Sequence, residues 1–263
     1  MSATLKVLKY ELEDVRRSRG VLAYGAILLA LTEGLLRFGG TDAGAMLSLL
    51  SVVLLLVPLV SLIFGTMYLY NARDFTELLL AQPVRRGALF RGLYLGLSLP
   101  LVASLVIGIG APFLWHGALD RESLPAFLGL LGTGVLLTFA FTAIASLAAV
   151  TIDDRARGLG AAIVAWLLAA VVYDGLILLV VTTFGDYPLE RPLIVLTLLN
   201  PVDLGRVLLL LRFDSAALMG YTGAVFEHFL GTAWGTVIAV GALLLWTGVP
   251  CALSLWRFRR KDF

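Results

Sequence analysis

Long apolar runs dominate the chain, and short polar segments separate them. A helix needs about 20 consecutive apolar residues to cross the hydrocarbon core of a bilayer. Several of the runs reach or approach that length without an interrupting charge. We therefore predict six transmembrane helices, at residues 21–38, 45–70, 88–114, 124–150, 159–184 and 233–256.

The composition agrees with that pattern. The chain is 60% hydrophobic and 14% charged, whereas a soluble domain has about 25% charged residues. Too little polar surface is present to cover a folded chain of 263 residues in water. The sequence therefore predicts an all-α integral membrane protein.

Positive charges divide unevenly between the connecting segments. With the N-terminus placed in the cytoplasm, fifteen of the 20 Lys and Arg residues fall on the inner side. The other five are Arg37, Arg121, Arg191, Arg206 and Arg212. Because inner loops of membrane proteins carry the excess of Lys and Arg, this favours six spans with both termini in the cytoplasm.

Residues 185–232 contain a further apolar stretch, PLIVLTLLNPVDLGRVLLLLRF, which is a candidate for a seventh span. Asp203 and Arg206 would then lie near its middle, where each costs about 2.5–3.5 kcal/mol to insert. A seventh span would also move the basic C-terminal segment outside. We therefore expect an outer helical hairpin, interfacial or partly inserted, that is broken at Asn200 and Pro201.

The predicted domain organisation is simple. Residues 1–20 place Leu5, Leu8, Leu12 and Val15 on one helical face, which is typical of an amphipathic helix lying in the inner membrane interface. A solvated helical tail is the alternative. These residues lack the apolar core of a signal peptide, so we expect no cleavable signal. Residues 21–263 form the six-span domain, with an inner loop at 71–91 and the hairpin at 185–232.

Motifs for catalysis or nucleotide binding are absent from the sequence. It contains no GxxxxGK[ST], GxSxG or HExxH pattern, so we expect no enzyme activity and no P-loop in this chain. Cys251 is the single cysteine, and the four methionines are widely spread. Since copper prefers thiolate, thioether and imidazole ligands, we expect no metal site; Met219 and His228 are the one pair worth testing.

Two acidic residues fall within predicted spans. Glu33 lies in the first and Asp174 in the fifth. Burying an ionisable side chain inside a membrane is energetically unfavourable, so such a residue is by default a candidate for a functional role. For Asp174 the alternative is a structural hydrogen bond or a pair with an arginine from the outer side, and the sequence leaves both interpretations open.

The inner loop RDFTELLLAQPVRRGALFRG, residues 73–92, joins the second and third spans. Phe75 and Leu78 to Leu80 give a short helix an apolar side, and Gln82-Pro83 ends it, because the residue before a proline disfavours helix. A short amphipathic helix at the inner face suits docking into a groove of a soluble partner. Anchoring to lipid headgroups is the alternative.

This loop, of the form E-x-L-L-x-x-P-V-x-R, together with six spans and a long outer segment before the last one, resembles the ABC-2 type permeases. In that family the loop is a coupling helix that enters a cleft of a separate cytoplasmic ATPase. The resemblance implies that this chain holds no cofactor and that ATP and Mg²⁺ bind to the ATPase. It assigns ATPase coupling to Asp74, Glu77, Leu78, Pro83, Val84, Arg85 and Arg86.

A second stretch, residues 198–231 with the core ALMGYTGAVF, is similar to the branch of the family that serves maturation of the copper–sulfur centre of nitrous oxide reductase. That resemblance implies a bacterial inner-membrane location, two permease copies and a periplasmic β-helical partner. Its contact residues would be Asn200, Pro201, Met219, Gly220, Tyr221, Phe226 and His228. The alternative within the family is an exporter of drugs or lipids.

Overall fold

The computed structural model describes residues 18–38, 42–80, 85–121, 123–185, 190–212 and 233–261. Within these residues the chain is helical and contains no strand. Its elements are α2 (Arg19–Phe38), α3 (Asp42–Asn71), α4 (Arg73–Leu80), α5 (Arg86–His116), α6 (Leu124–Thr151), α7 (Arg155–Leu167), the π-helical turn η1 (Leu168–Val172), α8 (Tyr173–Thr183), α9 (Glu190–Leu198), α10 (Pro201–Arg212) and α12 (Ala233–Arg260). The expected interfacial helix at residues 1–20 lies almost wholly outside the described residues.

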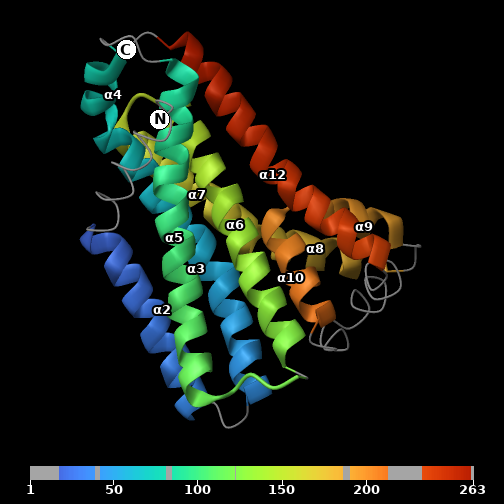
Figure 1. Ribbon diagram of the computed structural model, residues 1–263. Helices are drawn as coiled ribbons and strands as arrows, with labels where there is room; N and C mark the ends of the chain where they lie inside the picture. The colour runs from blue at the N-terminus through green and yellow to red at the C-terminus, as the bar shows by residue number, and fades with distance from the viewer. Residues whose placement is uncertain are drawn as a thin grey trace.

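Six of these helices are long and apolar enough to cross a membrane, as the hydrophobic pattern predicts. They are α2, α3, α5, α6, the continuous α7–η1–α8 segment and α12. In Figure 1, α4 and the end of α12 lie at the top, while the α5–α6 connection lies at the bottom. We call the end that carries α4 the inner end, following the charge distribution.

Helix α6 lies at the centre of the bundle and packs against α3, α5, α10 and α12. Three of its buried hydroxyl side chains, those of Thr138, Thr142 and Ser146, are hydrogen-bonded within or between the helices. Thr138 and Thr142 donate to backbone carbonyls one turn earlier, and Thr142 also bonds the Ser98 hydroxyl of α5 at 3.0 Å. Ser146 reaches Ser254 of α12 at 3.3 Å. Polar side chains thus join helices where lipid gives no hydrophobic driving force.

Small residues allow some helices to approach one another closely. A Cβ at Gly108 of α5 would lie 2.8 Å from the Leu28 Cβ of α2, and a Cβ at Gly65 of α3 would lie 2.5 Å from the Ala145 Cβ of α6. Larger side chains at these two positions would force the helices apart. Glycine thus allows α5 to pack closely on α2, and α3 to pack closely on α6.

The region 185–232 is broken where the sequence predicts a break. Helices α9 and α10 meet at an angle of 111° across residues 199–200, so they do not cross the membrane as one straight helix. Helix α10 packs against α3, α6 and α12, with Val202, Leu204 and Leu209 fully buried. Its described part is therefore inserted among the spans rather than lying on their outer surface.

Candidate functional site

Helix α4 begins with Arg73, which joins it to the inner end of α6. The Arg73 guanidinium donates to the carbonyl oxygens of Ala149 at 3.1 Å, Ile152 at 3.1 Å and Asp153 at 2.7 Å. These carbonyls belong to the last turn of α6 and the residues after it, where a helix leaves acceptors unsatisfied and its dipole favours a cation. A side chain from α4 thus caps the central helix of the bundle.

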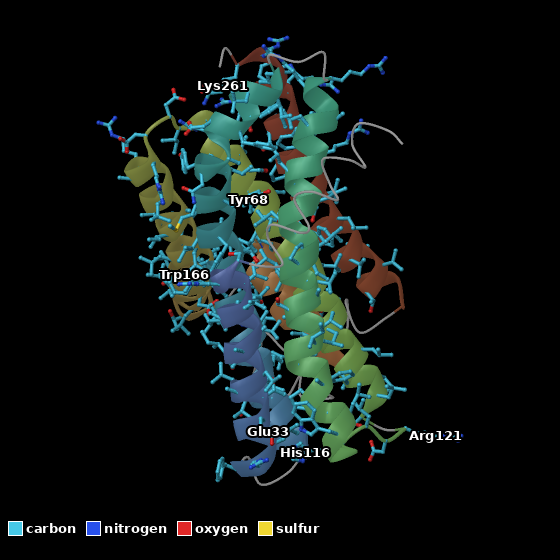
Figure 2. All side chains as sticks on the ribbon, turned by 60° about the vertical axis from the view of Figure 1, so that its left-hand side comes forward. Glu33, Tyr68, His116, Arg121, Trp166 and Lys261 are labelled. Atoms are coloured by element: carbon cyan, nitrogen blue, oxygen red, sulfur yellow. The ribbon has the colours of Figure 1, made fainter. Side chains whose placement is uncertain are left out.

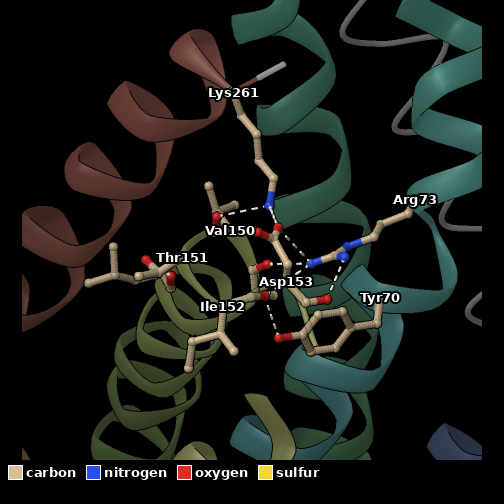
Figure 3. Close-up of polar contacts among 9 residues, drawn as sticks. Tyr70, Arg73, Val150, Thr151, Ile152, Asp153 and Lys261 are labelled. Carbon is tan, nitrogen blue, oxygen red and sulfur yellow. Dashed lines mark hydrogen bonds and ion pairs between the residues drawn. The ribbon is translucent and has the colours of Figure 1, made fainter. Parts of the chain in front are cut away.

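Tyr70 supports this contact from the end of α3. Its hydroxyl donates to the Ile152 carbonyl at 2.8 Å, and the Arg73 guanidinium carbon lies 4.5 Å from the centre of its ring. Figure 3 shows both side chains converging on residues 150–153. A Cβ at Gly158 of α7 would collide with the Tyr70 ring and hydroxyl, so glycine there allows α7 to start beside Tyr70.

The C-terminal residues complete the arrangement. Lys261 donates from Nζ to the Asp153 carboxylate at 2.6 Å and to the Val150 carbonyl at 3.1 Å. Arg86, at the start of α5, donates to the Lys261 carbonyl at 2.6 Å. The hydrogen bond from Lys261 lowers the pKa of Asp153 below its ordinary value, so this carboxylate is ionised at neutral pH. We call Tyr70, Arg73, Arg86, Asp153 and Lys261 the inner junction.

Helix α4 has one covered face and one free face. Thr76 is buried, and Leu79 and Leu80 pack on the cluster formed by Leu89, Phe90, Leu93, Tyr94, Ala143 and Phe258. Asp74, Glu77 and Leu78 are exposed, and Leu78 has 71% of its surface accessible. Residues spaced by three and four lie on one side of a helix, so these three form a continuous face that points away from the bundle.

The loop prediction needs one correction. Leu78 was expected on the apolar side with Phe75, Leu79 and Leu80, and the structure turns it outward with Asp74 and Glu77. Arg85 is exposed, whereas Arg86 belongs to the inner junction. Pro83 and Val84 lie outside the described residues.

The sequence analysis did not single out Asp153, and it counted Arg73 and Lys261 only among the positive charges of the inner side. Their meeting joins segments 80 and 108 residues apart along the chain. No local spacing encodes such a contact. The one signal for these contacts in the sequence was the presence of basic residues next to the ends of predicted helices.

Asn200 and Pro201 are buried at the break of the hairpin. Asn200 donates from Nδ2 to the Ala169 carbonyl of η1 at 2.7 Å and accepts from the Val202 amide at 3.0 Å. These two residues therefore hold the bend in place. The expected partner contact stays a prediction, because Met219, Gly220, Tyr221, Phe226 and His228 lie outside the described residues.

Asp174 of α8 pairs with an arginine, the structural alternative that the sequence left open. Both of its carboxylate oxygens accept from Arg206 of α10, at 2.6 and 2.8 Å. Arg206 also donates to Asp203 at 3.1 Å, and the neighbouring Tyr173 hydroxyl donates to the Leu196 carbonyl at 2.6 Å. Polar contacts thus attach the hairpin to the fifth span.

Glu33 lies at the outer end of α2, where Figure 2 shows it beside His116. Its carboxylate accepts from Trp115 Nε1 at 2.9 Å, lies 3.1 Å from His116 Nε2 and pairs with Arg37 one turn along α2. This cluster ties the outer ends of α2 and α5 together. Within the described residues, no group of three or more His, Cys, Asp or Glu side chains could hold a metal ion.

Comparison with known proteins agrees with the architecture. The profile of the family described as "ABC-2 family transporter protein" matches residues 5–263. A "Probable ABC transporter permease protein NosY" from Pseudomonas aeruginosa is 30% identical, with 99% of both chains covered. A protein of the same description from Stutzerimonas stutzeri is 27% identical, again with 99% of both chains covered.

Proposed function

Since this chain belongs to the ABC-2 family of transporter permeases, we propose that it is the membrane subunit that couples ATP hydrolysis to maturation of the copper–sulfur centre of nitrous oxide reductase. It is a multi-pass permease similar to NosY over nearly its whole length. In this proposal a separate NosF-like cytoplasmic ATPase binds ATP and Mg²⁺, and this chain carries no catalytic residue and no cofactor.

The observation that carries the proposal is the free face of α4. Asp74, Glu77 and Leu78 project from a helix whose other face is fixed on the bundle. A rigid, charged and apolar helix face suits insertion into a groove of a soluble protein. The ATPase binds there, with Pro83, Val84, Arg85 and Arg86 continuing the contact in the loop that follows.

The inner junction gives the movement of α4 a route into the membrane. Arg73 connects α4 to the end of α6, and α6 contacts α10 of the hairpin. Displacing α4 therefore displaces packed helices rather than a loose loop. For this to be a switch, the ATPase must make different contacts in its two states, since a ligand shifts an equilibrium only through such a difference.

On the outer side, a periplasmic β-helical partner (NosD-like) contacts the segment 198–231, and the complex holds two permease copies. Maturation is served by export of a sulfur species or by mechanical coupling to that partner. The chain of contacts from α4 through α6 to α10 supports mechanical coupling. Without the outer partner, the same inner architecture would suit an exporter of drugs or lipids.

Glu77→Arg tests the proposal, because it reverses one charge at an exposed position on the free face of α4. We expect normal expression of the permease but loss of ATPase retention during purification and loss of nitrous oxide reductase maturation. Arg121→Glu, a charge reversal in the exposed outer turn, is the matched control and should leave both unchanged. Normal maturation with Glu77→Arg would show that α4 is not the coupling site.

A further inference from the structure

Asp174, Asp203 and Arg206 form a cluster in which one guanidinium serves two carboxyl groups. Arg206 makes two hydrogen bonds to Asp174, at 2.6 and 2.8 Å, and its Nη1 reaches Asp203 Oδ1 at 3.1 Å. Asp174 comes from α8 in the fifth span, whereas the other two come from α10. The cluster carries one negative charge in excess when both carboxyls are ionised.

Asp203 is the buried member of the cluster. Only 4% of its surface is exposed, and its Oδ2 has no hydrogen-bond partner within the described parts of the chain. Burying a carboxylate oxygen without a partner is strongly unfavourable, and an unbalanced charge in a low-dielectric interior adds to the cost. The charged form of Asp203 is therefore destabilised at this position.

Arg206 is the one cation within ion-pair distance of Asp203 among the side chains that the structure describes. The groups that face Asp203 are Arg206, Asp174 and the Tyr173 hydroxyl. Helix α6 and turn η1 contain no ionisable residue. The ionisable residues of the other neighbouring helices lie at or toward the ends of those helices: Asp42, Tyr68 and Tyr70 in α3, Glu190 and Arg191 in α9, and Cys251, Arg257, Arg259 and Arg260 in α12.

We propose that Asp203 is a proton-binding site, and that its carboxyl shares the bound proton with Asp174. The two carboxyls are neighbours, because the Oδ1 atoms of both accept from the same Arg206 nitrogen, Nη1, at 2.6 and 3.1 Å. Protonation turns the unpartnered Oδ2 from an acceptor into a hydroxyl donor, and it makes the cluster neutral. The proton comes from bulk water, and no redox step or co-reactant is involved.

The site lies where the hairpin joins the fifth span, so proton occupancy controls that attachment. With the proton bound, Arg206 balances the single charge of Asp174. When the proton leaves, two carboxylates compete for one guanidinium, and their mutual repulsion weakens the link between α8 and α10. Like charges that share a site cannot both ionise freely.

Infrared spectroscopy of the full-length permease in lipid nanodiscs tests this directly through the carbonyl stretch of protonated carboxyl groups. At pH 5.5 we expect the wild type to show one such band and Asp203→Asn to lose it. Asp174→Asn should lose it as well, because Arg206 then balances Asp203 without a proton. Asp153→Asn, which removes an ionised surface carboxylate, is the matched control and should keep the band.

The proposal is overturned if the wild type has no band, if the band survives in Asp203→Asn, or if it survives in Asp174→Asn. Thermal unfolding gives an independent readout that does not depend on assigning the band. The wild type should lose stability as rising pH removes the proton, whereas Asp203→Asn, which mimics the protonated form, should lack that decline. Parallel curves for the two proteins would also overturn it.

Discussion

Arg73 shows how much of the inner junction depends on a single side chain. Its guanidinium joins three carbonyl oxygens at the end of α6, and its side chain is about one-quarter exposed, at 27%. The sequence identifies it as one of many positive charges on the inner side and says nothing about its partner. Only folding brings residues 73 and 153 together, because the loop before the third span and two spans separate them along the chain.

Arg73→Gln should weaken the attachment of α4 without altering its free face. A hydrogen bond from a charged group contributes about 1.5–3 kcal/mol, and we expect a loss of about 2 kcal/mol in stability because part of the side chain is solvated. The ATPase should still be retained on purification, while maturation falls. Thermal unfolding and a maturation assay measure the two effects.

The control for that change is Arg91→Gln. Among the described residues, Arg91 bonds the Gly87 carbonyl of its own helix at an exposed position, so its loss should leave stability and maturation nearly unchanged. If both substitutions behaved alike, the inner junction would have no special part in coupling.

At the scale of the element, α4 is the part that the sequence predicted well in outline and wrongly in one detail. A short helix was expected before Gln82-Pro83, and α4 covers Arg73–Leu80. Three consecutive leucines cannot all point the same way, because successive helical residues are about 100° apart. Which leucine faces outward depends on the position of the hydrophobic cluster around Phe90 on which Leu79 and Leu80 pack. That cluster includes Phe258 from the far end of the chain.

The two faces of α4 should respond differently to substitution. Leu78→Ser removes an exposed side chain, so stability should change by less than about 0.5 kcal/mol, whereas retention of the ATPase should fall. Leu89→Ala, in the fully buried layer beneath α4, should cost about 2–5 kcal/mol. Unfolding measurements and co-purification separate the two outcomes. A large loss of stability with Leu78→Ser would contradict the orientation of α4.

At the scale of the whole molecule, the sequence predicted the number of spans and the break in the hairpin. Both follow from local information, namely the length of apolar runs and the position of Asn200-Pro201. It did not predict that α10 would lie among α3, α6 and α12, or that Arg206 of α10 would pair with Asp174. Those contacts depend on how the helices pack, and no periodicity along the chain specifies them.

The orientation of the bundle rests on the charge distribution and is open to direct measurement. In a Cys251→Ala background, Arg121→Cys should react in intact cells with a maleimide that cannot cross the inner membrane. Arg155→Cys, at the start of α7, should react only after the membrane is permeabilised. The reverse pattern would place α4 on the outer side and remove the basis for ATPase docking.

The coupling of this permease to an ATPase and an outer partner is tested most directly by affinity purification of the chain from its native membrane in mild detergent, with identification of the proteins retained. We expect a cytoplasmic ABC ATPase and a periplasmic β-helical protein. An ATPase alone would favour an exporter of drugs or lipids. Retention of neither protein would contradict the role assigned to α4.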